Sequence, residues 1–204
     1  MSISMNTRVH KKRAYVQRER AASAEETRAR IVEATVALHE ELGPTRTTIS
    51  AIAERAGVQR LTVYRHFPDE KALFAACTGR WSGENPAPDA AAWKAVRDPR
   101  ERTERALRAY YAYYRGTERM WTVIYRDLAD TPAIRKTVAA YHAHIDDVVD
   151  DLAQAWAGRA RASAELRATL RHAFRFQTWA SLTGDGLDDA RAARLAVSWA
   201  RGVG

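Results

Sequence analysis

Residues 49–67 read ISAIAERAGVQRLTVYRHF, and their spacing predicts two short helices that cross at a tight turn. Ala53 is small, as the first helix requires where the second helix crosses close to it. Gly57 follows four positions later, where the turn requires the left-handed backbone that glycine adopts at least cost. Apolar residues flank the turn and would lock the crossing: Ile52, Val58 and Val63. This is the spacing of a helix-turn-helix, whose second helix lies in the major groove of DNA.

The second helix of this pair is crowded with hydrogen-bond donors. Amide, guanidinium, hydroxyl and imidazole groups stand where base edges and phosphates would lie. These groups belong to Gln59, Arg60, Thr62, Tyr64, Arg65 and His66. The same spacing also occurs in ordinary helical corners with a solvated polar face. Because the helix caps, the chain breaks and the donors coincide in this stretch, we favour DNA binding.

Helix signals continue on both sides of the pair. A helix is expected to begin near Ser23, at a capping-box pattern, and to end before the Gly43–Pro44 pair. Thr47 and Thr48 are expected to cap the first helix of the pair, and Asp69 the helix that follows it. Residues 23–80 are therefore predicted to form the DNA-binding domain.

Residues 1–22 show no useful helical periodicity and are predicted to be a flexible basic arm. Six cations oppose one acid, Glu19, and such a charge balance suits a polyanion. The cations are Arg8, Lys11, Lys12, Arg13, Arg18 and Arg20. A disordered tail that never contacts DNA is the other interpretation, and charge alone does not decide between them.

The composition indicates a soluble globular protein that is rich in helix. The chain has 204 residues, of which 46% are hydrophobic and 28% charged, with only 10 Gly and 6 Pro. No alternating strand pattern appears, so the fold is predicted to be all-α. No apolar run is long enough to span a membrane, and no signal peptide is evident, so the expected location is the cytoplasm. The single cysteine, Cys77, excludes an intrachain disulfide and a cysteine-based zinc site.

The composition changes after residue 80. Residues 81–97 gather glycine and proline and are predicted to be a linker. Residues 98–204 are predicted to form a second helical domain. Three apolar stripes indicate its helices. These stripes run from Val138 to Ala155, from Leu166 to Gln177 and from Leu187 to Arg201.

Several short motifs between Thr27 and Phe74 occur in a specific combination. They are Thr27-Arg-x-Arg-Ile-Val, Gly43 with Thr47-Thr-Ile, Ile52-Ala-x2-Ala-Gly-Val, Thr62-Val-Tyr-Arg-His-Phe and Ala72-Leu-Phe. Together they resemble the DNA-binding domain of TetR-family regulators, over about a quarter of the chain. The resemblance implies nine or ten helices, a homodimer formed through the last two long helices, and a small-molecule pocket in the C-terminal domain.

The same resemblance implies roles for individual residues. It assigns phosphate contacts to Thr48, Thr62, Tyr64 and His66, and it places Gln59 and Arg60 near the bases. One departure concerns Glu70, because the family commonly has a lysine there that reaches a phosphate. Since the order here is Glu70-Lys71, we expect Lys71 to make that contact.

The C-terminal half carries many aromatic residues, which line ligand pockets but more often form simple core. The family resemblance favours a pocket. The residues expected to line it are Tyr114, Trp121, Tyr125, His142 and Trp179.

Two other functional classes compete with a ligand-responsive repressor. An enzyme is not expected, because no nucleophile elbow occurs and His142 and His144, two apart on a helix, point to different sides. No cofactor or metal is expected either. A DNA-binding protein without an effector, or an activator, stays open. The expected partners are palindromic operator DNA, a small-molecule effector and a second copy of the chain.

Overall fold

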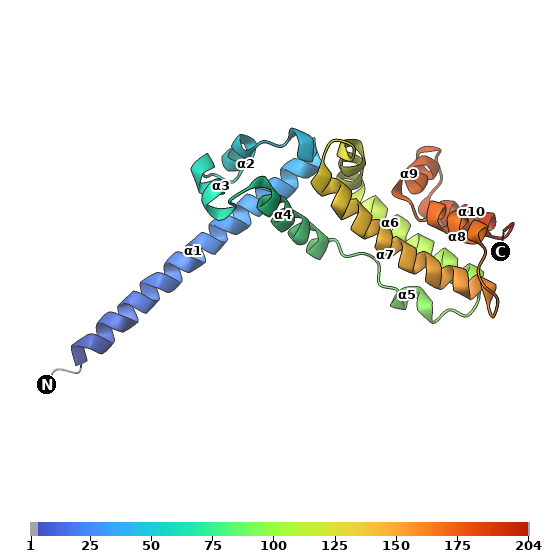
Figure 1. Ribbon diagram of the computed structural model, residues 1–204, viewed down its shortest axis with the longest axis horizontal. Coiled ribbons are helices and arrows are strands. Elements are labelled where there is room, and N and C mark those ends of the chain that lie inside the picture. Colours follow the sequence, from blue (N-terminus) through green and yellow to red (C-terminus); the bar gives the residue numbers. More distant parts are fainter. Residues whose placement is uncertain (1–3, 204) are drawn as a thin grey trace. The chain divides into compact units, whose positions relative to one another are not determined.

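The computed structural model describes residues 4–203, and the side chains of residues 17–203. The described residues form ten α-helices, α1 to α10, with one 3-10 turn and no strand (Figure 1). The predicted all-α fold is therefore confirmed. The chain divides into two compact units, Met1–Gly83 and Glu84–Gly204, and each is described by itself.

The N-terminal unit is built on one long helix, α1 (Ser4–Leu42). The helix does not begin at Ser23 as expected, because residues 4–22 are already helical. No glycine or proline precedes Gly43, so nothing in the sequence stops a helix before that point. The arm predicted to be flexible is thus helical from Ser4 onward, and its first three residues lie outside the described part.

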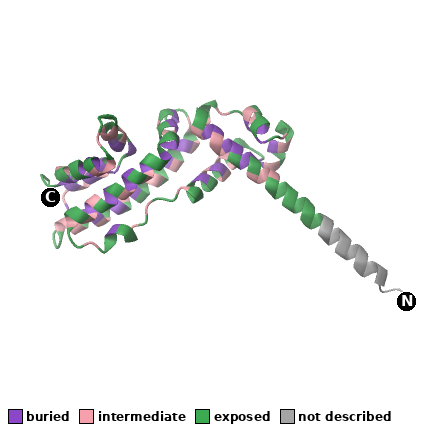
Figure 2. Ribbon diagram, turned by 180° about the vertical axis from the view of Figure 1, so that it is seen from behind, coloured by how far each residue is buried: buried purple, intermediate pink, exposed green. Residues whose placement is uncertain are grey.

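Four short elements pack against the C-terminal part of α1. They are η1 (Pro44–Arg46), α2 (Ile49–Arg55), α3 (Arg60–His66) and α4 (Glu70–Glu84). Their shared core is apolar and is made by Ile31, Val32, Leu38, Ile52, Val63, Phe67 and Leu73, among others. Residues 17–26 of α1 are exposed, and burial begins only where these elements meet it (Figure 2).

The predicted linker, residues 81–97, is partly helical. Helix α4 continues to Glu84 through two glycines, and the indole N–H of the buried Trp81 donates to Glu40 on α1 at 3.2 Å. A second short helix, α5 (Ala91–Lys94), follows. Its Trp93 is buried beside Tyr110 of α6, with the ring centroids 6.0 Å apart. Buried tryptophans therefore order part of a stretch whose composition alone indicates a linker.

The C-terminal unit is built on two long helices, α6 (Pro99–Asp127) and α7 (Pro132–Ala157). Helices α8 (Ala164–Ala173), α9 (Phe176–Gly184) and α10 (Asp189–Ala200) pack beside them. The apolar stripe from Leu166 to Gln177 does not form one helix, because the chain breaks between α8 and α9 at Phe174 and Arg175. A turn joins α9 and α10, and its Gly186 has a φ of 88°.

Side-chain caps fix the starts of three of these helices. The carboxylate of Asp98 accepts from Glu101 N at 2.8 Å, and that of Asp188 accepts from Arg191 N at 2.7 Å. The hydroxyl of Ser163 accepts from Leu166 N at 3.0 Å. Each cap satisfies a backbone N–H that a helix start leaves without a partner. Within the described residues, no helix is long and apolar enough to cross a membrane.

Candidate DNA-binding site and ligand site

The crossing of α2 and α3 follows the chemistry of its sequence. Thr48 caps α2, and its hydroxyl accepts from Ala51 N at 3.2 Å. Gly57 takes a φ of 65°, the left-handed conformation that the turn was predicted to need. Val58 N then donates to Ala53 O at 2.9 Å and closes the turn. The predicted helix-turn-helix is confirmed.

Side chains from α1 hold this crossing in place. The guanidinium of Arg30 donates to Ala56 O at 3.2 Å, at the end of α2. Arg55 of α2 donates to both carboxylate oxygens of Glu41, at 2.6 and 2.8 Å, and this hydrogen bond raises the pKa of Arg55. The guanidinium of Arg28 lies 4.9 Å from the centroid of the Phe67 ring. These contacts with α1 fix the position of α2 and of the end of α3.

Helix α3 has a buried face and an exposed face. Val63 is 1% exposed, and Phe67, which follows the helix, is buried in the same core. The opposite face exposes Arg60, Tyr64 and Arg65, while Thr62 and His66 lie half-buried at its edges. Tyr64 is 43% exposed, so part of its ring as well as its hydroxyl is open to solvent.

The predicted DNA-contacting residues all lie at the surface of the N-terminal unit. Gln59 is exposed directly before α3, Thr48 is exposed at the start of α2, and Lys71 is exposed in the first turn of α4. Within the described part of the chain, no protein group pairs with the side chains of Gln59, Arg60, Arg65 or Lys71. Their donors therefore remain available to a ligand.

Leu61 is a surface residue that the sequence reasoning missed. It is 58% exposed on the outward face of α3. A leucine in this position offers an apolar contact of the kind that reads the methyl group of thymine. Its distance of two residues from the buried Val63 was the available signal, because residues two apart on a helix do not share a face.

The five residues expected to line a pocket lie together in the C-terminal unit. The ring of Tyr114 lies 6.2 Å from Trp121 and 6.0 Å from Trp179. Trp121 lies 5.8 Å from Tyr125, which in turn lies 6.3 Å from His142. Tyr125 and His142 also share a hydrogen bond of 2.9 Å between the hydroxyl and Nε2. The structure thus brings all five residues into one group.

Three further rings complete this group. Phe176 lies parallel to Tyr125 at 5.7 Å, Tyr141 lies 4.5 Å from Trp121, and Tyr113 stacks on Tyr141 at 6.4 Å. We call these eight residues the aromatic cluster: Tyr113, Tyr114, Trp121, Tyr125, Tyr141, His142, Phe176 and Trp179. Tyr114, Trp121, Phe176 and Trp179 are buried, whereas Tyr125 is half-buried and His142 exposed.

Burial sets the protonation of the polar groups at this open edge. It lowers the pKa of His142, and the nearby Arg175 lowers it further. Burial also raises the pKa of Tyr125. At neutral pH the edge therefore presents a neutral imidazole and a neutral phenol.

Comparison with known proteins identifies the N-terminal unit. The family model described as bacterial regulatory proteins, tetR family, matches residues 31–77, which include α2, α3 and most of the core around them. Residues 31–77 therefore carry the DNA-binding part of the TetR family. This is a family of DNA-binding transcription regulators. No curated protein matches the chain.

Solved structures of TetR-type regulators share the fold. A TetR-like transcriptional regulator from Rhodococcus sp. RHA1 is 23% identical, with a TM-score of 0.59, and the match covers 86% of this chain and 94% of that one. The multidrug binding protein EbrR, complexed with imidazole, is 20% identical, with a TM-score of 0.58 and coverage of 84% and 93%. SmeT in complex with triclosan is also 20% identical, with a TM-score of 0.55 and coverage of 86% and 90%.

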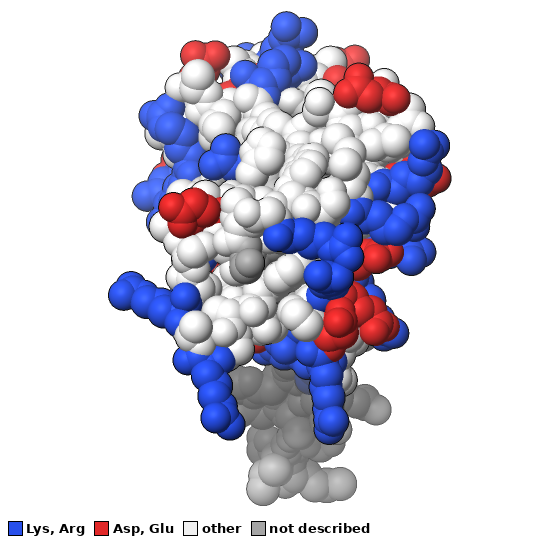
Figure 3. All heavy atoms as spheres, turned by 90° about the vertical axis from the view of Figure 1, so that its right-hand side faces the viewer, with Lys and Arg blue, Asp and Glu red and all other residues white. Residues whose placement is uncertain are grey.

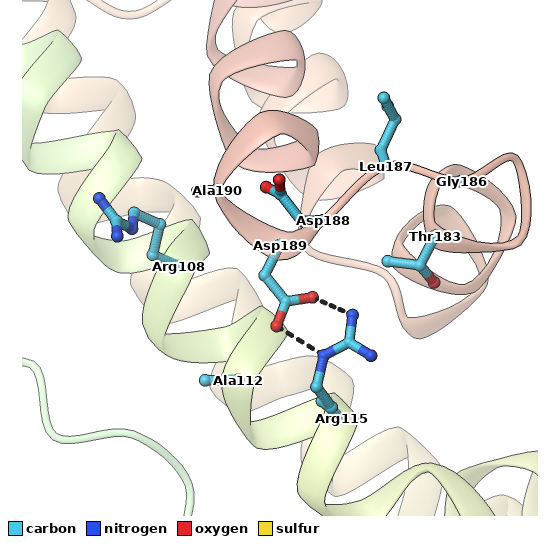
Figure 4. A pocket seen from close by; sticks show the side chains of 9 residues that line it. All are labelled: Arg108, Ala112, Arg115, Thr183, Gly186, Leu187, Asp188, Asp189 and Ala190. Atoms are coloured by element: carbon cyan, nitrogen blue, oxygen red, sulfur yellow. Dashed lines mark hydrogen bonds and ion pairs between the residues drawn. The ribbon is translucent and has the colours of Figure 1, made fainter.

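The C-terminal unit also has an open groove of about 720 Å³ between α6 and the α9–α10 turn (Figure 4). It is lined by Arg108, Ala112, Arg115, Thr183, Gly186, Leu187, Asp188, Asp189 and Ala190. Arg115 donates to both carboxylate oxygens of Asp189, at 2.8 and 2.7 Å, and this lowers the pKa of Asp189. The groove is lined by charged and apolar residues alike, and none of the five expected pocket residues lines it.

Cys77 and His39 form a buried polar contact outside these sites, with Sγ and Nδ1 3.4 Å apart. Burial raises the pKa of the Cys77 thiol to about 12, so the thiol is protonated and a poor nucleophile. Within the described residues, no group of three or more histidine, cysteine or acidic side chains could hold a metal ion.

Proposed function

We propose that this TetR-family chain is a transcription repressor that binds palindromic operator DNA as a homodimer and leaves it when a small hydrophobic or aromatic effector binds. The exposed face of α3 is the observation that carries the proposal. It presents unpaired donors on a helix whose neighbour, α2, is held by hydrogen bonds with α1. Because its target is DNA, we place the protein in the cytoplasm.

In this proposal Gln59 and Arg60 read base edges, since they stand at the start of α3. Phosphate contacts fall to the residues around them, which fix the register of the helix on DNA. These residues are Thr48, Thr62, Tyr64, Arg65, His66 and Lys71. The hydroxyl of Thr48 accepts from a backbone N–H, which leaves its own hydrogen free to donate to a phosphate.

The dimer would form through α8 and α10. Leu195 on α10 is 40% exposed, and Trp199, one turn further along, is half-buried. The face of the molecule drawn in Figure 3 shows an uncharged area bordered by both basic and acidic side chains. A self-complementary face of this kind suits a twofold axis.

The effector would bind at the aromatic cluster. Rings with a few polar groups at one edge are typical of small-molecule sites. SmeT was solved with triclosan, and EbrR is described as a multidrug binding protein, which supports an effector of this kind. The two α3 helices of a dimer must lie about 34–36 Å apart, or a suitable multiple, to dock together. An effector that favours a dimer state with another spacing lowers operator affinity by its differential binding to the two states.

A DNA-binding protein without an effector, repressor or activator, is the second candidate. The tight burial of Tyr114, Trp121 and Trp179 favours it, because such rings also make an ordinary core. An enzyme gains no support from the family, whose model describes regulatory proteins. Intrinsic tryptophan fluorescence, titrated with a panel of hydrophobic and aromatic metabolites, separates the first two candidates.

In-vitro selection of bound DNA tests the DNA-binding role and supplies the operator. Arg60→Ala or Gln59→Ala should then cost about 1–3 kcal/mol of binding free energy and relax base preference at one position. Arg100→Ala, at an exposed arginine of α6, is the matched control and should bind as the wild type does. An Arg60→Ala chain with unchanged affinity and unchanged preference would show that the groove assignment is wrong.

A further inference from the structure

Three backbone carbonyls at the C-terminal end of α8 each accept a hydrogen bond from a side-chain hydroxyl. Thr178 donates to His172 O at 2.6 Å, Tyr111 to Ala173 O at 2.9 Å, and Tyr114 to Phe174 O at 2.6 Å. A helix end leaves such carbonyls without intrahelical partners, and burial makes an unpaired one costly. Two tyrosines of α6, three residues apart, therefore hold the end of α8 in place.

One of these two tyrosines belongs to the aromatic cluster. The ring of Tyr114 contacts Trp121, Phe176 and Trp179, and its hydroxyl accepts from that of Tyr141 at 2.8 Å. The hydrogen bonds thus run from Tyr141, which is half-buried at the edge of the cluster, through Tyr114 to the backbone of α8. Because the rings are closely packed, a molecule that enters the cluster must displace at least some of them.

The same end of α8 also touches α10. His172 lies in the last turn of α8, and its ring lies 6.0 Å from that of Trp199 on α10. Trp199 is one of the two residues we expect to anchor the dimer. A displacement at the end of α8 would therefore reach the proposed dimer face through a single side-chain contact.

We propose that Tyr114 is a positioning residue that transmits effector binding from the aromatic cluster to the dimer face, while Tyr111 helps to hold the same end of α8. An effector that moves the Tyr114 ring withdraws its hydroxyl from Phe174 O. The last turn of α8 then loses a cap, and the contact between His172 and Trp199 shifts. This inference rests on the proposed function, since it assumes both an effector at the cluster and a dimer through α8 and α10.

The effect can be tested without knowing the effector, because Tyr114→Phe removes the same hydrogen bond that the effector would break. Tyr111→Phe removes the second one. Tyr110→Phe is the matched control: it lies on the same helix and is equally buried, but its hydroxyl bonds to His144 Nε2 on α7, at 2.9 Å, and not to α8. All three variants delete one oxygen and keep the ring.

Sedimentation of the full-length variants gives the dimer dissociation constant. Thermal unfolding and operator binding are measured beside it, without effector. Tyr114→Phe and Tyr111→Phe should each weaken the dimer about threefold to tenfold, the worth of one buried hydrogen bond, with a parallel loss of operator affinity. Tyr110→Phe should lower the unfolding temperature by a similar amount and leave the dimer dissociation constant as in the wild type. A purely structural role would move all three alike.

Equal dimer constants for Tyr114→Phe and Tyr110→Phe would overturn the inference and leave the proposed function standing. If Tyr114→Phe does not fold, Tyr141→Phe carries the same test, because it removes only the donor to Tyr114. It should weaken the dimer in the same direction but less, and an unchanged dimer would again overturn the inference. A wild-type chain that is monomeric, or that selects no DNA, would overturn the proposed function itself before any variant is compared.

Discussion

At the scale of single residues, Gly57 shows how backbone geometry determines which residue type a position accepts. Its φ of 65° lies in the left-handed region, which costs an L-residue with a Cβ roughly 1–2 kcal/mol. The nearest heavy atom to a Cβ added there is Arg30 Nη1, at 3.9 Å, which is ordinary contact. The penalty of a side chain at this position therefore comes from the backbone and not from a clash.

Gly57→Ala should lower the free energy of unfolding by about 1 kcal/mol, because the turn forces the new residue into the left-handed region. Gly116→Ala is the matched control, since Gly116 lies inside α6 and a Cβ added there meets nothing within 4 Å. It should raise the free energy of unfolding by about 0.5–1 kcal/mol, as alanine favours a helix over glycine. Urea unfolding of both variants checks this. Equal signs for the two changes would contradict the backbone argument.

The conformation of a residue could be predicted from the sequence where its immediate chain neighbours determine it. The cap at Thr48, the turn at Gly57 and the buried Phe67 follow from chemistry within a few positions, and the structure agrees on each. Leu61 was missed, because its exposure depends on which face of α3 packs against α1. That packing is tertiary structure, and the sequence of the turn contains no pattern that predicts it.

At the scale of elements, α1 contains two different kinds of helix. Its C-terminal part has an apolar face that α2 to α4 cover, whereas residues 17–26 are exposed on all sides. A periodicity argument recognises only the first kind, because it looks for an apolar stripe. The helix over residues 4–22 follows instead from good helix formers and the absence of breakers, which is a weaker signal.

Deletion of residues 1–20 should weaken binding to every DNA sequence and flatten the dependence of affinity on salt, if Lys11, Lys12 and Arg13 contact phosphates. Each lost phosphate contact reduces the slope of log affinity against log salt by about 0.9. Thermal unfolding should hardly change, since the described residues of this stretch, 17–20, are exposed. Affinity measured at several salt concentrations decides the point, and an unaltered slope would mean that the segment does not touch DNA.

The break between α8 and α9 could not be predicted from sequence. Its stripe from Leu166 to Gln177 continues without a glycine or a proline, as it would in one helix. The break is stabilised from outside by the hydroxyls of Tyr111 and Tyr114, which lie about 60 residues earlier in the chain. The aromatic cluster could be predicted only in part, because its membership also depends on contacts between residues far apart in the chain. Its five expected members stand out by residue type, while Phe176 and Tyr141 join it only through the packing of α7 and α9.

At the scale of the whole molecule, DNA binding and dimerisation depend on each other. One α3 helix offers few base contacts, so a single N-terminal unit has too little binding energy to select an operator. A twofold dimer doubles these contacts and fixes their spacing, which is why operator symmetry mirrors protein symmetry. Leu61 on α3 and Leu195 on α10 are both exposed, and in this proposal each faces a different partner.

Leu195→Glu should therefore split the dimer and abolish operator binding while the helices stay folded. A charge at a side chain that is 40% exposed costs the monomer little, but it must be desolvated when the two copies meet. Leu61→Glu makes the same change at an exposed leucine of α3 and serves as the control: it should stay dimeric and lose DNA through repulsion from the phosphates. Sedimentation, read beside circular dichroism and operator binding, separates the two. A helical Leu195→Glu chain that remains dimeric would place the interface elsewhere, because Trp199 shares the face of Leu195 and no dimer through that face could bury a glutamate there without loss.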